Sequence, residues 1–138
     1  MAEYASAIVG LIAVGAHVNH KTYQAVKSFK HAQAEFLALS NEITEFCLIL
    51  KAVETALSGD SLPQAAVAEV DLANLLQQSH ETINEVSALL SETQAVGDTE
   101  ITANRRKWLV KARRAKSLQE KVKGHRLFLL GIIQAHML

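Results

Sequence analysis

Side chains that could do chemistry are scattered along the chain. His17 and His20 stand three residues apart and could share a helix face as a metal-ligand pair, but no cysteine or carboxylate lies nearby in sequence to complete a set. Glu42 and Glu45 have the same spacing, and we interpret them as an exposed helix surface. Cys47 lies in the apolar stretch "EITEFCLIL" and is expected to be a buried small hydrophobe. No metal or cofactor site is predicted.

The sequence also lacks the motifs that position catalytic groups. It contains no P-loop, no G-x-S-x-G and no H-E-x-x-H pattern. We therefore do not expect an enzyme. A single cysteine cannot form an internal disulfide, which favours a reducing compartment such as the cytoplasm.

The stretch "AIVGLIAVGAHV", residues 7–18, has no formal charge and contains Gly10 and Gly15. The uncharged run from residue 4 to residue 19 is shorter than the roughly 20 residues that cross a bilayer, and Glu3 near the start disfavours a secretory signal. Two interpretations remain open. The stretch is a core helix whose small residues let neighbours approach, or it is a helix that can leave the core and enter a membrane.

Charge is distributed unevenly along the chain. Residues 1–100 carry a net charge of −9 and residues 101–138 a net charge of +9, with Glu120 as the single acid of the second part. On a helix, the late bases fill most of the arc beside an apolar stripe that begins at Trp108. Three interpretations of that arc remain open. It is a solvated helix face whose bases are partly paired with acids of other helices, a surface that binds anionic lipid, or a surface that binds the phosphates of nucleic acid. Nucleic acid is disfavoured because the rest of the chain is acidic and few aromatics could stack on bases.

Helical periodicity runs through the whole sequence, and no segment alternates as a strand would. The breaks fall at "SGDSLPQ" (58–64), where Ser61 and Pro63 fit a helix start, and at "VGDTE" (96–100). A helix of 55 residues would be about 80 Å long, so a turn is also needed near residues 30–33. We predict an all-α, four-helix up-down bundle with long helices at about 3–29, 33–58, 63–96 and 99–137. The predicted core stripes consist of Val26, Phe29, Phe36, Leu39, Ile43, Phe46, Leu50, Val53, Leu72, Leu76, Ile83, Val86, Leu90, Trp108, Ala112, Ala115, Val122, Leu129 and Ile133.

Four segments together resemble a known family. They are "SAIVGLIAVGAHVNHKTYQAV", "EFLALSNEITEFCLILKAVETAL", "LLQQSHETINEVSALL" and "RRKWLVKARRAKSLQEKVKGHRLFLLGIIQA". The chain resembles the fungal HeLo-like domain, the N-terminal domain of STAND-type NOD-like receptor proteins. That group is related to the HeLo domain and to the four-helix bundle of the mixed-lineage kinase domain-like pseudokinase. The chain departs from it by lacking an early Asp-Pro and a proline between the first two helices.

The resemblance implies a single domain over residues 1–138 that is the N-terminal domain of a longer protein. It implies a cell-death effector that an upstream NOD-like receptor activates, and that oligomerises with other copies. Its N-terminal helix then inserts into the plasma membrane, with Glu3 as the polar group at the leading end. The implied membrane-insertion residues are Ala5, Ile8, Val9, Gly10, Leu11, Ile12, Val14, Gly15 and Val18. The implied contacts to anionic lipid are Arg105, Arg106, Lys107, Lys111, Arg113 and Arg114.

An alternative belongs to a different functional class. The same bundle could be a non-lytic adaptor that docks protein partners or self-associates without binding lipid. Under the first hypothesis the protein is cytoplasmic at rest and moves to the plasma membrane when activated. Binding to vesicles at low and raised salt separates the two.

Overall fold

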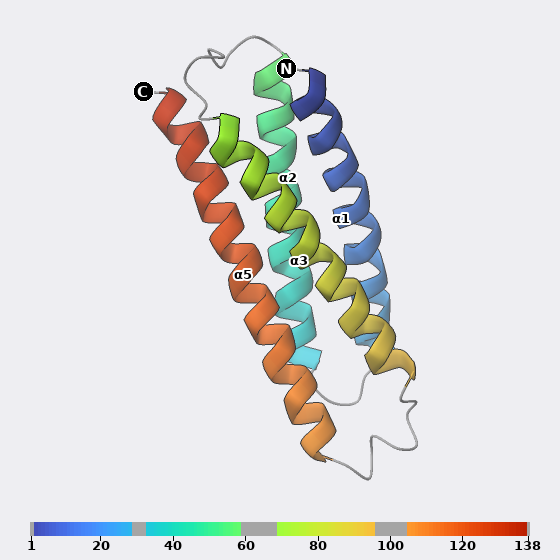
Figure 1. Ribbon diagram of the computed structural model, residues 1–138. Helices are drawn as coiled ribbons and strands as arrows, with labels where there is room; N and C mark the ends of the chain where they lie inside the picture. The colour runs from blue at the N-terminus through green and yellow to red at the C-terminus, as the bar shows by residue number, and fades with distance from the viewer. Residues whose placement is uncertain (1, 29–32, 59–68, 96–104, 138) are drawn as a thin grey trace.

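The computed structural model describes residues 2–28, 33–58, 69–95 and 105–137, and every one of these residues is helical. The helices are α1 (Ala2–Ser28), α2 (Gln33–Ser58), α3 (Glu69–Ala95) and α5 (Arg105–Met137). They pack side by side as a four-helix bundle (Figure 1). The predicted all-α bundle is therefore confirmed.

Successive helices run in alternating directions along the bundle (Figure 1). The neighbouring pairs are α1 with α2, α2 with α5, α3 with α5 and α1 with α3. Pairs α1/α2 and α3/α5 are antiparallel, whereas α1/α3 and α2/α5 run in the same direction. The bundle thus consists of two helical hairpins lying side by side, with α1 diagonally opposite α5.

The helix bounds agree closely with the sequence pattern where both are defined. α1 ends at Ser28 and α2 begins at Gln33, the last residue of the predicted turn at residues 30–33. Residues 30–32 of that turn and the predicted helix starts at residues 63 and 99 lie outside the described residues. The expected caps at Ser61 and Pro63 lie outside them as well.

One continuous core fills the space between the helices. Its largest fully buried side chains include Phe36 and Phe46 from α2, Ile8 from α1, Ile83 from α3 and Leu129 from α5. Burying each such side chain stabilises the fold by about 1.5–3 kcal/mol. Among the predicted core residues whose side chains are described, all are buried except Ala112, which is partly buried. The side chains of Phe29 and Ile133 lie outside the described ones. Trp108 lies in α5, and nothing of its side chain is described.

Candidate functional site

α1 contributes one side of its apolar run to the core. Ile8, Leu11 and Val18 are buried, with exposed fractions of 0, 2 and 4%. Gly15 is buried on the same side, and Ile12 and Val14 are partly buried at its edges. These positions recur at intervals of three and four, as a helix face requires. Four of the nine predicted membrane-insertion residues therefore face the interior of the bundle, and two more lie at the edge of that side.

The opposite side of α1 is exposed and carries no Asp, Glu, Lys or Arg over residues 6–17. Val9 is 48% exposed. A surface helix of a bundle normally presents charged or polar residues to water, so this outer face is unusual. The side chains of Glu3 and Ala5, which the prediction also included, lie outside the described ones. The described exposed residues of the face are Ser6, Ala7, Val9, Gly10, Ala13, Ala16 and His17.

The two glycines of the run have different environments. A β-carbon built at Gly15 would lie 2.8 Å from Sγ of Cys47, so α1 and α2 approach closely at this point. A β-carbon at Gly10 would meet nothing within 4 Å. Packing therefore accounts for Gly15 and leaves Gly10 unexplained. Cys47 itself is only partly buried, and burial raises the pKa of its thiol although Lys51 opposes the shift.

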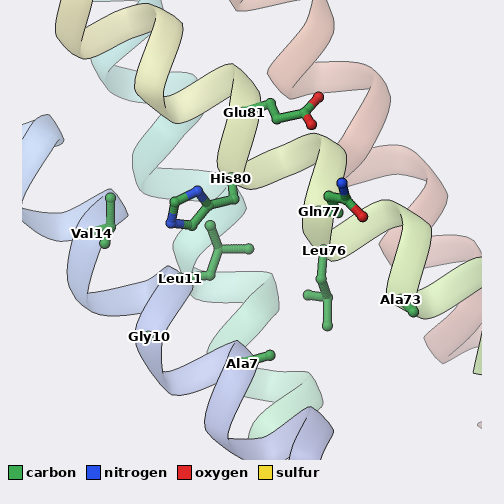
Figure 2. Close-up of a pocket in the computed structure, with 9 residues that line it drawn as sticks. All are labelled: Ala7, Gly10, Leu11, Val14, Ala73, Leu76, Gln77, His80 and Glu81. Atoms are coloured by element: carbon green, nitrogen blue, oxygen red, sulfur yellow. The ribbon is translucent and has the colours of Figure 1, made fainter.

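An open groove of about 720 Å³ runs between α1 and α3. Figure 2 shows Leu11 and Val14 of α1 facing α3, with the ring of His80 directed toward them. The side chain of Glu81 points away from α1. The groove is lined by Ala7, Gly10, Leu11, Val14, Ala73, Leu76, Gln77, His80 and Glu81. The exposed face of α1 is thus continuous with an apolar recess.

On its other flank α1 is joined to α2 by hydrogen bonds. Nδ2 of Asn19 donates to Oγ1 of Thr44 at 2.7 Å, and Oγ of Ser40 donates to Oδ1 of Asn19 at 2.7 Å. Oγ1 of Thr44 donates to the carbonyl of Ser40. The residues of α1 before Asn19, where they are described, contact α2 and α3 through apolar surface instead.

The predicted lipid-binding bases are only partly free. Nζ of Lys111 and Nη1 of Arg114 lie 2.8 and 2.7 Å from the same carboxylate oxygen of Glu92 on α3. These two hydrogen bonds lower the pKa of Glu92. Arg113 is exposed and has no ion-pair partner among the described residues. The side chains of Arg105, Arg106 and Lys107 lie outside the described ones.

Glu42 is not an exposed surface residue, so that interpretation was wrong. Its side chain is 10% exposed, and Oε1 accepts a hydrogen bond from Nε of Arg126 at 2.7 Å. Glu45 is 57% exposed and lies 3.4 Å from the same nitrogen. Glu42 lies three residues after Leu39 and four before Phe46, both buried, so helical spacing indicated that its side chain is buried, although not which base it pairs with.

The histidines do not gather into a metal site within the described helices, where no group of three potential ligands is close enough to hold an ion. His17 and His20 are exposed on α1. His125 of α5 instead lies 3.0 Å from Oγ1 of Thr82 on α3. Thr82 uses its hydrogen to bond the carbonyl of Gln78, so Nε2 of His125 is the donor to the hydroxyl.

Comparison with protein-family models, curated proteins and solved structures gives no match. The resemblance to the HeLo-like group therefore stays a prediction that rests on the sequence segments alone. Among the described helices, none has the length and hydropathy needed to cross a bilayer.

Proposed function

We propose that the protein is a membrane-acting effector whose first helix leaves the bundle and enters an anionic bilayer once copies have gathered. One observation carries the proposal. Between residues 6 and 17, α1 presents no Asp, Glu, Lys or Arg on either its buried or its exposed side. A helix that is uncharged all round suits an apolar environment on every side. In the bundle, however, the outer side of this segment is exposed to water.

Packing energetics favour the bundle at rest. Releasing α1 exposes Ile8, Leu11 and Val18, at a cost of roughly 5–9 kcal/mol for the three side chains together. Water alone cannot offset that cost, whereas burial of the same side chains in lipid can. Clustering adds to the effect because several helices then share the membrane defect that they create.

The length of the uncharged run bears on how the membrane is damaged. Residues 4–19 extend about 24 Å as a helix, against about 30 Å for the hydrocarbon core. A single copy would therefore enter the bilayer without crossing it. We propose that leakage requires several copies, and that the consequence in a cell is loss of plasma-membrane integrity after an upstream receptor gathers them. The resemblance to the HeLo-like group supports this cellular setting.

The close approach of Gly15 and Cys47 provides a direct test. A β-carbon at residue 15 lies 2.8 Å from Sγ of Cys47, close to the roughly 3 Å that separates a β-carbon from the far sulfur in a disulfide. Gly15→Cys should therefore form a bridge with the natural cysteine and tie α1 to α2. The bridge can be opened with reductant in the same sample.

Dye release from phosphatidylserine vesicles is the measurement. The oxidised Gly15→Cys protein should leave vesicles sealed, and the reduced protein should release dye. Two controls carry a new thiol without the bridge: Gly10→Cys, and Gly15→Cys combined with Cys47→Ala. Both should release dye whether oxidised or reduced. Equal leakage by the bridged and the reduced protein would contradict the role proposed for α1.

A second candidate function is favoured by the groove between α1 and α3. Its apolar lining and open shape suit the docking of a partner helix (Figure 2), as in the adaptor alternative. An adaptor would not release dye in any form of the experiment above. It would also fail to cosediment with anionic vesicles at low salt.

A further inference from the structure

α5 has an outward face that no described helix covers. Four large apolar side chains on it, Leu109, Val110, Leu127 and Phe128, are 52, 54, 50 and 50% exposed. They form two doublets separated by 18 residues, which is about five helical turns. Both doublets therefore lie on one side of the helix.

Glycines on this face are not required by the fold of a single chain. A β-carbon at Gly124 or at Gly131 would meet nothing within 4 Å. Glycine within a helix costs about 1 kcal/mol relative to alanine. Their presence leaves two shallow positions beside Leu127 and Phe128, where a side chain of another molecule could lie close to the backbone.

The charges of this face differ from those on the flanks of α5. Lys111, Arg114, Lys121 and Arg126 are paired with acids of α2 or α3. Arg113, Lys116, Glu120 and Lys123 are exposed and have no ion-pair partner among the described residues. The outward face thus keeps charges of both signs.

We propose that this face binds a second copy of the chain, with the two α5 helices antiparallel about a two-fold axis near residues 118–119. In that register each doublet meets the other doublet of the second chain: Leu109 lies opposite the partner's Leu127 along one edge of the face, and Val110 lies opposite the partner's Phe128 along the other. The two-fold axis repeats both contacts, so all four apolar side chains are covered in each copy.

The residues between the doublets also match in this register. The bulky Arg113 lies opposite the partner's Gly124, where the missing side chain leaves room for it. The partner's Glu120 lies level with Ser117, one residue from Lys116 and about one turn from Arg113, within reach of both long side chains. Lys116 also approaches the partner's Lys123 along the same edge, and the partner's Glu120 lies close to both cations.

A second copy fits this face better than a lipid surface does. A bilayer would cover the doublets but would bring Glu120, the single acid of residues 101–138, against anionic headgroups. The antiparallel copy instead gives that acid two cations. The inference does not depend on the proposed membrane activity, and its test contains no lipid, so the two proposals can fail separately.

Sedimentation velocity over a concentration range up to about 1 mM measures the association. The wild type should show a monomer–dimer equilibrium. Leu127→Glu should weaken it about tenfold or more, because it places a charge within the apolar contact. Leu48→Glu is the matched control, since Leu48 is 59% exposed on α2 and lies outside the face. It should leave the equilibrium unchanged.

A charge exchange tests the register. Arg113→Glu and Glu120→Arg should each weaken the dimer, and the two substitutions together should restore it, because the pair stays complementary across the axis. Circular dichroism confirms that each variant is folded; all these positions are exposed. A wild type that is monomeric throughout the range would overturn the proposal, and so would a dimer that is insensitive to Leu127→Glu.

Orientation can be tested with single cysteines in a Cys47→Ala background. Ser117→Cys places its thiols near the axis, and a short bismaleimide should link the two copies. Leu109→Cys places its thiols about 28 Å apart along the helices in the antiparallel pair, so the same reagent should fail. Efficient linking through Leu109→Cys would indicate a parallel pair and overturn the register.

Discussion

Gly15 of α1 lies against the thiol of Cys47 in α2, and a β-carbon at Gly15 would approach that sulfur to 2.8 Å. The contact sets how closely the first two helices pack. Gly10, five residues earlier, has no such neighbour within 4 Å. The two glycines therefore give a matched pair for measuring what close packing requires.

Gly10→Ala should raise the free energy of unfolding by up to about 1 kcal/mol, because alanine is the better helix former and nothing blocks its methyl group. Gly15→Ala should lack this gain, since the sulfur of Cys47 must move. In a Cys47→Ala background the gain at residue 15 should return. Urea unfolding of the double-mutant cycle measures the coupling, and additive effects would show that the sulfur imposes no constraint.

Val9→Glu should abolish dye release while leaving the bundle folded. Val9 is 48% exposed, so the charge is solvated at rest, but it would have to enter lipid with α1. Leu48→Glu on α2 changes charge by the same amount and should release dye normally. Undiminished leakage by Val9→Glu would show that this face of α1 does not enter the bilayer.

Glu92→Gln should strengthen binding to phosphatidylserine vesicles. The substitution releases Lys111 and Arg114 from the carboxylate that both contact, and each base near an anionic surface strengthens binding roughly fivefold. Glu81→Gln is the matched control, because it removes the same charge without freeing a described base. Cosedimentation at low and raised salt distinguishes the variants, and equal affinities would mean that these bases do not face lipid.

Arg126→Met should lower the free energy of unfolding by about 3 kcal/mol, because it leaves the buried carboxylate of Glu42 unpaired. Adding Glu42→Gln should recover part of the loss. Lys121→Met, which breaks an exposed pair with Glu85 at 3.3 Å, should cost less than about 1 kcal/mol. Chemical denaturation of the three proteins gives the comparison, and equal losses for Arg126 and Lys121 would contradict the assigned burial.

The bundle should lose stability as the pH falls below 6.5. Burial lowers the pKa of His125 from its ordinary value of 6.5, and Lys121 adds to the shift. The unfolded chain therefore binds a proton before the folded chain does. The contribution of His125 is complete above pH 6.5 and is lost as the pH falls toward its lower folded value. His125→Gln should flatten the pH dependence of the unfolding free energy below pH 6.5, and unfolding titrations of both proteins measure the difference.

Sequence periodicity was sufficient for the architecture because the core stripes are regular. Ile83 and Leu129 lie where the helical repeat places them, and the uncharged run on α1 was visible without coordinates. Spacing within one helix does not show which helices become neighbours. The pairing of Arg126 with Glu42 depends on α5 lying beside α2, 84 positions away in sequence, and no local pattern carries that information.

The sequence also did not show which apolar residues of α1 are exposed to water. Val9 and Ile8 are adjacent and both apolar, yet one is half exposed and the other fully buried. The division follows from the two neighbours of α1, which cover only part of its circumference. Gly10 and Gly15 likewise have identical chemistry and opposite environments.

Because α1 and α5 are diagonally opposite, α1 can leave the bundle without breaking the contacts of α5 with α2 and α3. A protein that lost α1 would break the contacts to α2 and α3 and keep both contacts of α5. The remaining three helices would still be joined through α5 in the middle, with its charged rows intact. Release of α1 therefore leaves α2, α3 and α5 packed together.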